Sequence, residues 1–172
     1  MQYDDAQNFS EGLAAIYKNN YWGFIDKKGK EIIPTQYKYV SIFKKGLAKF
    51  GENKKFGFIN KTGKVIIPAQ YDDAADFHEE LTFVQKNNQW GFIDKTGREI
   101  IPIQYDQTYG FFEELAPVRK NNLWGFIDKK GQEVIPIQYD WANWFQEGLA
   151  LVKKNGKHQF IDKTGKIILP KQ

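Results

Sequence analysis

Residues 90–106 read WGFIDKTGREIIPIQYD, and close copies of this stretch occur four more times along the chain. Aligning the copies without gaps on the residue before the glycine gives a column with a spacing of 34 residues: Trp22, Phe56, Trp90, Trp124 and His158. Cutting the chain before the tyrosine of each QY pair yields five complete units, 3–36, 37–70, 71–104, 105–138 and 139–172. This internal periodicity predicts a single repeat domain over residues 1–172.

Each unit has the pattern of β-structure. Its GFID and EIIP segments are short, rich in aromatic and β-branched residues, and bounded by turn residues. Asp94 opens a turn in which its side chain can accept backbone hydrogen bonds, and Gly97 tolerates the left-handed conformation that closes it. Asn-Asn at 87–88 and 121–122, or Asn-Gly at 155–156, favours a two-residue hairpin turn.

The proline of each IIP segment has no N–H to donate to a neighbouring strand, so it is predicted to mark a strand end or a sheet edge. These prolines are Pro34, Pro68, Pro102, Pro136 and Pro170. With the YDxAxxF segment as a weaker fourth strand, each unit is predicted to form an antiparallel β-meander.

A sheet of 34 residues buries too little surface to be stable alone, so the units are expected to stack and share a core. The predicted fold class is therefore all-β. A closed five-bladed β-propeller is favoured because the number of units is whole and the end units carry no unusual polar capping pattern. An open β-solenoid is the alternative.

Composition narrows the class of protein further. An aromatic content of 16% argues against disorder, and the absence of cysteine excludes disulfides, zinc thiolate sites and thiol nucleophiles. No apolar run approaches the roughly 20 residues that span a bilayer, and the first residues lack the pattern of a signal peptide. We therefore expect no membrane segment and no signal peptide. The compartment stays open, with the cytoplasm as the default location and secretion as the alternative if a segment once preceded the first residue.

The Trp-Gly-Phe-Ile-Asp stretches at 22–26, 90–94 and 124–128, with the KTGxxIIPxxYD pattern that follows, resemble the bacterial WG-repeat family. The resemblance covers the whole chain in one register. Departures from the pattern occur at Phe56, Asn60, Lys38 and the pair His158 and Gln159. The family implies a repeat-built, non-catalytic interaction module, and it implies no particular ligand.

A residue that recurs in every unit is most simply structural. The turn aspartates Asp26, Asp94, Asp128 and Asp162 are thus predicted to cap turns, and the repeated tyrosines to pack. Function is expected where the units differ, which is in three columns of the YDxAxxF segment. The columns are Asp5, Tyr39, Asp73, Gln107 and Trp141; Gln7, Ser41, Ala75, Tyr109 and Asn143; and Asn8, Ile42, Asp76, Gly110 and Trp144.

Trp141 and Trp144 are the clearest exceptions to the repeat. They could stack on a peptide or a sugar, or they could fill space in the unit that has His158 in place of tryptophan. Tyr39, Tyr109 and Phe112 extend either interpretation. The predicted ligand-binding residues are Tyr39, Tyr109, Trp141, Trp144, Asp5, Asp73 and Asp76.

Catalysis is not expected. Propeller glycosidases use two carboxylates at a set separation, and nothing in the sequence separates an acid from a base among Asp5, Asp73 and Asp76. His78 followed by Glu79 and Glu80 lacks the spacing of metal ligands, and no serine lies in a nucleophile motif. We expect no metal and no cofactor.

The turn lysines Lys27, Lys61, Lys95, Lys129 and Lys163 could form a basic rim that attracts nucleic acid. However, lysine on exposed turns also keeps sheet edges soluble, and an acidic column at Glu11, Glu79, Glu113 and Glu147 dilutes the positive field. The sequence therefore predicts a non-enzymatic binding module or scaffold for a protein or peptide. A lectin-like module is the alternative, and a nucleic-acid binder or a propeller glycoside hydrolase is less favoured.

Overall fold

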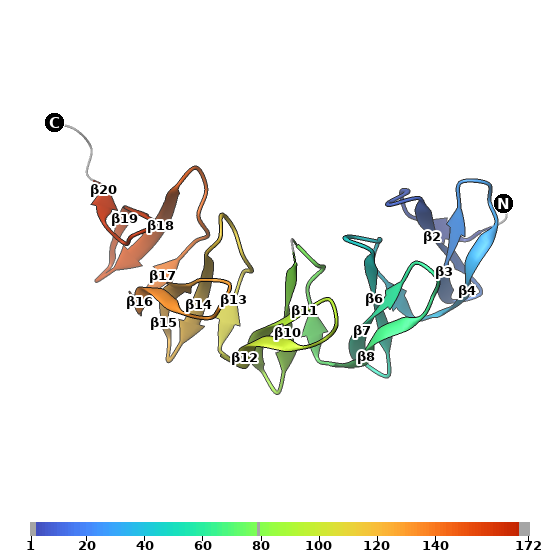
Figure 1. The fold of residues 1–172 in the computed structure, drawn as a ribbon, viewed down its shortest axis with the longest axis horizontal. Coiled ribbons are helices and arrows are strands. Elements are labelled where there is room, and N and C mark those ends of the chain that lie inside the picture. The colour runs from blue at the N-terminus through green and yellow to red at the C-terminus, as the bar shows by residue number, and fades with distance from the viewer. Residues whose placement is uncertain (1–2, 79, 169–172) are drawn as a thin grey trace. The chain divides into compact units, whose positions relative to one another are not determined.

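The structure, a computed structural model, describes residues 3–78 and 80–168, in which twenty strands form five sheets (Figure 1). The first two sheets contain β1 (Asp5–Ala6), β2 (Leu13–Lys18), β3 (Tyr21–Asp26) and β4 (Glu31–Tyr37), then β5 (Tyr39–Val40), β6 (Leu47–Glu52), β7 (Lys55–Asn60) and β8 (Val65–Tyr71). The third contains β9 (Asp73–Ala74), β10 (Leu81–Lys86), β11 (Gln89–Asp94) and β12 (Glu99–Tyr105). The last two contain β13 (Gln107–Thr108), β14 (Ala116–Lys120), β15 (Leu123–Ile127) and β16 (Glu133–Tyr139), then β17 (Trp141–Ala142), β18 (Leu149–Lys154), β19 (Lys157–Asp162) and β20 (Ile167–Ile168).

Each sheet is a meander whose strands lie in chain order, and neighbouring strands such as β1 and β2 or β14 and β15 pair antiparallel. The all-β prediction and the weak fourth strand are confirmed, since a two-residue strand opens each sheet. The boundaries differ slightly from the predicted units. Tyr37 closes β4 and pairs with Trp22, so the tyrosine at which the sequence was divided belongs to the preceding sheet. Pro170, Glu79 and the end of the unit 139–172 lie outside the described residues.

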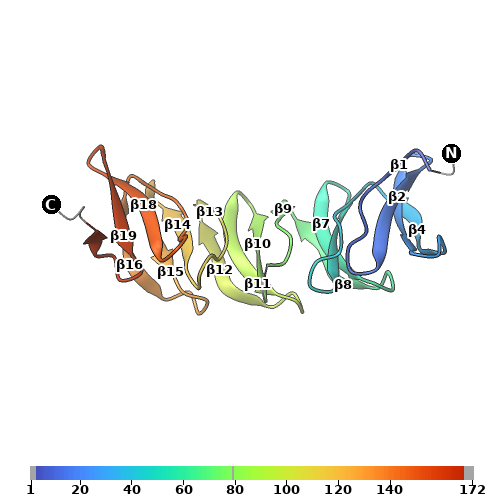
Figure 2. The ribbon, with the colours of Figure 1, turned by 90° about the horizontal axis from the view of Figure 1, so that it is seen from above.

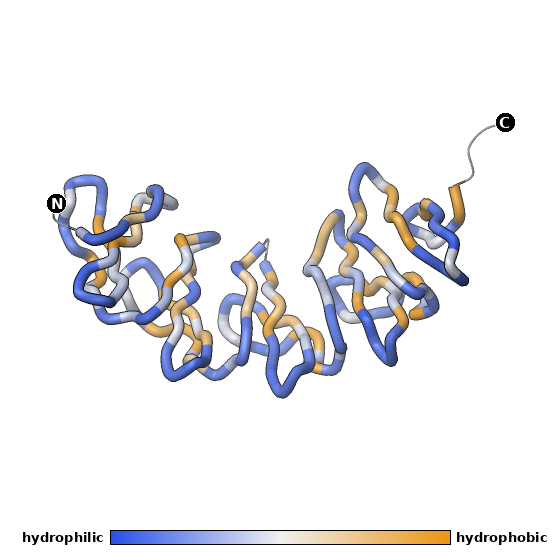
Figure 3. Tube along the Cα trace, turned by 180° about the vertical axis from the view of Figure 1, so that it is seen from behind, coloured by the Kyte–Doolittle hydropathy of each residue, from blue (hydrophilic) through white to orange (hydrophobic). Residues whose placement is uncertain are grey.

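The predicted turn chemistry is confirmed. The Asp26 carboxylate accepts hydrogen bonds from the backbone N–H groups of Lys28 and Lys30, at 2.8 and 2.9 Å. Asn60, a departure from the repeat, accepts the equivalent two bonds at 3.0 Å through its amide oxygen. The Asn hairpins also adopt positive φ at both central residues, 53° and 62° at Asn87 and Asn88. In Figure 3 the tips between strands are mostly hydrophilic, and the hydrophobic segments lie along the strands.

The close approach of two strands explains why a glycine follows the tryptophan in the Trp-Gly pair. β3 and β4 pair with a register shift between Trp22 and Phe24, which brings the β4 backbone over Gly23. A Cβ atom there would lie 2.6 Å from the Ile33 carbonyl oxygen and 2.8 Å from the Pro34 carbonyl carbon. Pro34 lies in the middle of β4, which is the edge strand of its sheet, so of the two predicted placements the edge is confirmed.

The described chain divides into two compact units, one within residues 1–87 with residues 93–98 and the other within residues 88–92 with residues 99–172. In the first unit, Phe24 of β3 packs on Phe43 of the next sheet with ring centroids 4.8 Å apart. In the second, Phe126 of β15 packs on Phe145 at the same distance. Figure 2 shows β15 beside β14 and β18 beside β19 within this second unit. A single closed ring stays a prediction.

Adjacent sheets within each unit are also joined by a carboxylate. One Glu113 oxygen accepts a hydrogen bond from the Gly148 N–H at 3.0 Å and lies 3.0 Å from the Lys163 ammonium, both in the following sheet. Glu11 makes the equivalent contacts with Gly46 and Lys61, at 3.0 and 3.2 Å. The sheets are therefore fastened by the same polar contact in both units.

This contact makes stability depend on pH. The hydrogen bond and ion pair with Lys163 hold the pKa of the Glu113 carboxyl below its ordinary value of 4.5. A lowered pKa stabilises the fold above the unfolded value, and that stabilisation is lost as the pH falls through the folded pKa. We expect Glu113→Gln to flatten the decline of melting temperature below pH 4.5, whereas Glu31→Gln, an exposed carboxylate on β4, leaves it unchanged. Parallel declines in all three proteins would contradict this assignment.

Candidate functional site

The predicted site residues fall into separate places. Tyr39, Asp73 and Asp76 lie near one another in the first compact unit, and Asp5 lies apart on β1. Tyr109 and Trp144 meet in the second unit. Trp141, only three residues before Trp144, contacts a different neighbour. The variable columns therefore do not converge on one site within either unit.

Tyr39 and Trp141 occupy equivalent positions in two repeats and make the same kind of aromatic contact. Tyr39 meets the Phe56 ring edge-on at 5.6 Å, and Trp141 meets the His158 ring edge-on at 6.5 Å. Phe56 and His158 are the two positions of the Trp-Gly column that lack tryptophan. The three 34-residue repeats that keep this tryptophan have no aromatic residue in the column of Tyr39 and Trp141. They carry Asp5, Asp73 and Gln107 there. An aromatic residue on the short strand thus accompanies each lost tryptophan, which favours a packing role for Tyr39 and Trp141.

The three acidic residues that the repeat does not share, Asp5, Asp73 and Asp76, each contact a neighbouring group. The Asp5 and Asp73 carboxylates each accept a hydrogen bond from the N–H of the next residue at 2.7 Å. The Asp76 carboxylate lies 3.0 Å from the Lys44 ammonium. Among the residues that the structure describes, no group of three or more histidine, cysteine or acidic residues could hold a metal ion.

The Tyr39 hydroxyl lies in a charged environment. Partial burial raises its pKa, and the negative charges of Asp76 and Asp73 raise it further. The Lys49 ammonium lies 5.4 Å from the centre of the Tyr39 ring and donates a hydrogen bond to a backbone carbonyl at 2.5 Å. Burial and the two carboxylates therefore both favour the neutral hydroxyl over the phenolate.

The second compact unit carries an aromatic cluster in which Trp144 is exposed and Tyr109 and Phe112 are partly buried. Trp144, which is 39% exposed, stacks on Phe112 with centroids 5.3 Å apart and an interplanar angle of 28°. The edge of Tyr109 meets Trp144 at 6.1 Å, and Tyr109 itself stacks on buried Trp124 at 5.1 Å. We call Tyr109, Phe112 and Trp144 the aromatic platform. Because Trp124 supports it from below, the platform is a preformed apolar surface.

A cavity of about 430 Å³ adjoins the platform on the fifth sheet. Its lining residues are Asn143, Trp144, Gln146, Glu147, Leu149, Leu151 and Phe160. Leucine and aromatic side chains supply an apolar wall, and the two amides and the carboxylate supply hydrogen-bonding groups. This size and mixed lining suit a side chain of a bound partner.

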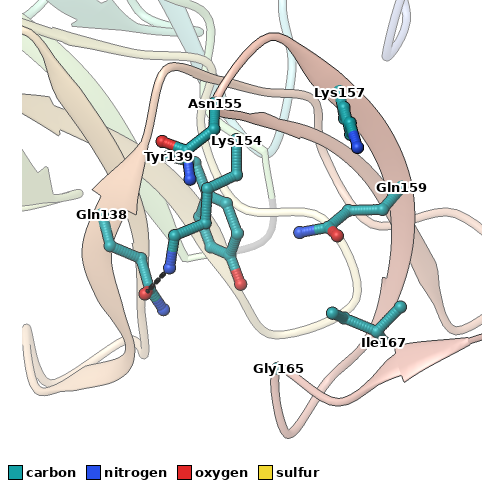
Figure 4. Close-up of a pocket in the computed structure, with 8 residues that line it drawn as sticks. All are labelled: Gln138, Tyr139, Lys154, Asn155, Lys157, Gln159, Gly165 and Ile167. Atoms are coloured by element: carbon teal, nitrogen blue, oxygen red, sulfur yellow. Dashed lines mark hydrogen bonds between the residues drawn. The ribbon is translucent and has the colours of Figure 1, made fainter.

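A second cavity, of about 480 Å³, lies where the fifth sheet departs from the repeat (Figure 4). Gln159 stands there in the column of Gly23. Across the cavity from Gln159 and Ile167, the Tyr139 ring lies beside Lys154, whose ammonium donates a hydrogen bond to Gln138 at 2.5 Å. In the described part of this sheet, Phe160 of β19 pairs with Ile168 of β20 and Ile161 pairs with Ile167.

The basic column carries less unpaired charge than the sequence suggests. Four of its lysines form ion pairs with glutamates at 2.8 to 3.2 Å. The pairs are Lys61 with Glu11, Lys95 with Glu80, Lys129 with Glu114, and Lys163 with Glu113. Within the described residues, no helix is long and apolar enough to cross a membrane.

Comparison with known proteins places these observations in a family. The family model described as "WG containing repeat" matches residues 1–22, 22–56, 56–90, 90–124 and 124–157. No curated protein matches the chain.

Solved structures share the fold at low sequence identity. A eukaryotic initiation factor matches with a TM-score of 0.60 at 11% identity, covering 98% of this chain and 56% of its own. Kluyveromyces lactis Hsv2 matches with a TM-score of 0.55 at 10% identity, covering 92% of this chain and 60% of its own. These neighbours are β-propellers, and the chain spans about three fifths of their length. The sheets are thus propeller-like blades.

Proposed function

The chain belongs to the WG containing repeat family, and from this premise we propose that it is a non-enzymatic module that binds a protein or peptide on the aromatic platform. The observation that carries the proposal is Trp144, which is 39% exposed and stacked on Phe112. Four of the five units have no tryptophan at this position, so the repeat does not require it for folding. Large rigid aromatic side chains on a preformed surface are typical anchors of protein interfaces.

The surroundings of the platform support a peptide as ligand. One face of Trp144 lies against Phe112, and Trp144 also lines the cavity whose apolar wall includes Leu149 and Leu151. A partner with a large apolar side chain would bury that side chain there while its backbone meets the amides of Asn143 and Gln146. The Glu147 carboxylate in the same lining favours a partner that carries a basic residue.

A lectin-like function is the second candidate. It is favoured by the two amide side chains beside Trp144, because amides hydrogen-bond sugar hydroxyls while an indole stacks on the sugar ring. The packing of Tyr39 and Trp141 against Phe56 and His158 leaves Trp144 as the main stacking residue for this function. Peptide and sugar would therefore compete for the same surface.

Selection from a phage-displayed random peptide library tests the proposal. We expect enriched peptides to carry an aromatic or large aliphatic residue, and Phe112→Ser or Trp144→Ser to weaken their binding by about 30-fold, the effect of removing an interface anchor. Leu123→Ser is the matched control, because Leu123 is exposed on the same pair of sheets but lies outside the platform. Its binding should equal that of the unmodified protein.

Two results would decide against a peptide. Enriched peptides that bind the Phe112→Ser protein as well as the original would place the site elsewhere. A glycan array that yields binding sensitive to Trp144→Ser, together with a peptide selection that yields none, would assign the platform to carbohydrate.

A further inference from the structure

The same aromatic contact joins neighbouring sheets at four junctions. A phenylalanine from the third strand of one sheet packs on a phenylalanine from the loop of the next, with centroids 4.8 to 4.9 Å apart. The pairs are Phe24 with Phe43, Phe58 with Phe77, Phe92 with Phe111, and Phe126 with Phe145. All eight rings are buried. The fifth member of each column is exposed: Phe160 at 51% and Phe9 at 49%.

The residues around Phe160 correspond to those that surround a buried loop phenylalanine at the other junctions. In the first unit, Phe43 lies in a buried cluster with Leu13, Ala15 and Phe24 of the preceding sheet. The residues at the same positions of the fifth sheet are Leu149, Leu151 and Phe160, and they line the cavity of about 430 Å³. This cavity therefore has the lining that accepts a loop phenylalanine at the other junctions.

The fifth sheet and the first sheet each carry half of the groups that form the polar contact between sheets. Glu11 and Glu113 each bind a glycine N–H and a turn lysine of the following sheet. Glu147 is the next acid in that column, and the first-sheet positions that correspond to its partners are Gly12 and Lys27. In the part of the chain that the structure describes, no hydrogen bond or ion pair reaches the side chain of Glu147 or Lys27, and no hydrogen bond reaches the Gly12 N–H.

We propose that the outer face of the fifth sheet binds the first sheet of a second copy of this chain, head to tail. Phe9 of one copy enters the cavity beside Phe160 of the other, and Glu147 pairs with Lys27 across the junction. The first sheet of a second copy supplies the residues that hold these positions at the other junctions: Phe9 stands in the column of Phe43, and Lys27 in the column of Lys61. Such a contact is heterologous, because it joins two different surfaces.

This self-association goes beyond the peptide-binding function and is tested on other residues. Trp144 lines the cavity and also belongs to the platform, so it is left unchanged. Phe9 and Lys27 belong to the junction alone and Phe112 belongs to the platform alone, whereas Phe160 and Glu147 line the cavity that both proposals use. Phe9→Asp therefore tests self-association without altering the peptide site, and Phe112→Ser tests peptide binding without altering the junction.

Sedimentation velocity over a concentration series tests the junction. We expect the unmodified protein to form larger species as its concentration rises, and Phe9→Asp and Phe160→Asp each to remain monomeric with unchanged melting temperatures. An equimolar mixture of the two variants should form a heterodimer and nothing larger, because each keeps one intact face. Val134→Asp, at an exposed position outside the junction, should associate like the unmodified protein.

A charge exchange tests the pairing of Glu147 with Lys27. Glu147→Lys and Lys27→Glu alone should each weaken association by at least about tenfold, and the double variant should recover it, since opposite charges then face each other again. An unmodified protein that stays monomeric at every concentration would overturn the proposal. A mixture of Phe9→Asp and Phe160→Asp that fails to form the heterodimer would overturn it as well.

Discussion

Replacing Gly125 with alanine is expected to lower the free energy of unfolding by about 3 kcal/mol, at the upper end of the usual cost of overpacking. A Cβ atom at this position would lie 2.7 Å from the Ile135 carbonyl oxygen and 2.7 Å from the Ile137 backbone nitrogen. Both atoms belong to the backbone of β16, so no side-chain rotation can relieve the clash. β16 would have to leave its register with β15. Urea denaturation of the two proteins measures the difference.

Gly156→Asn is the matched control for this variant. Gly156 has a positive φ of 77°, and nothing lies within 4 Å of a Cβ built there. Asn122 holds the equivalent turn position of the fourth sheet at φ 66°. The control should therefore unfold within about 0.5 kcal/mol of the unmodified protein, as surface substitutions usually do. Equal losses in both variants would show that the glycine acts through backbone flexibility and not through the close approach of β16.

Phe126→Ala is expected to cost about 4 kcal/mol, because it removes a fully buried ring at the junction with Phe145 and leaves a cavity. Phe160→Ala, at the same position of the next unit, should cost less than about 1 kcal/mol when measured on dilute monomer, since Phe160 is 51% exposed. Urea denaturation at low protein concentration measures both. A large loss for Phe160→Ala under those conditions would mean that its ring is covered within a single chain.

The sequence predicted the features that depend on local chemistry. The 34-residue period, the hairpin turns and the capping by Asp26 and its equivalents all follow from residues that interact within a few positions of one another. The weak strand at the start of each sheet was also predicted, from the YDxAxxF segment that recurs in each repeat. Asn60 shows that the turn needs a side-chain oxygen and not a charge.

The sequence did not predict what depends on approach between strands and sheets. Gly23 is required because β4 shifts its register over β3, and no local signal in the Trp-Gly pair encodes that shift. Trp141 and Trp144 were treated alike, yet Trp141 lies on strand β17 facing His158, whereas Trp144 follows that strand and reaches the preceding sheet. One signal in the sequence distinguishes Trp141 from Trp144. An aromatic residue stands in the column of Tyr39 and Trp141 only in the two repeats that have Phe56 or His158 in place of tryptophan.

The most direct test of the proposed binding surface uses the five tryptophans as reporters. We would record the indole N–H resonances of ¹⁵N-tryptophan-labelled protein while adding a peptide enriched in the phage selection. The largest shift should belong to Trp144, with a smaller one at Trp124 beneath Tyr109, while Trp22, Trp90 and Trp141 remain unchanged. A largest shift at Trp141, with Trp144 unmoved, would contradict the assignment of the aromatic platform as the binding surface.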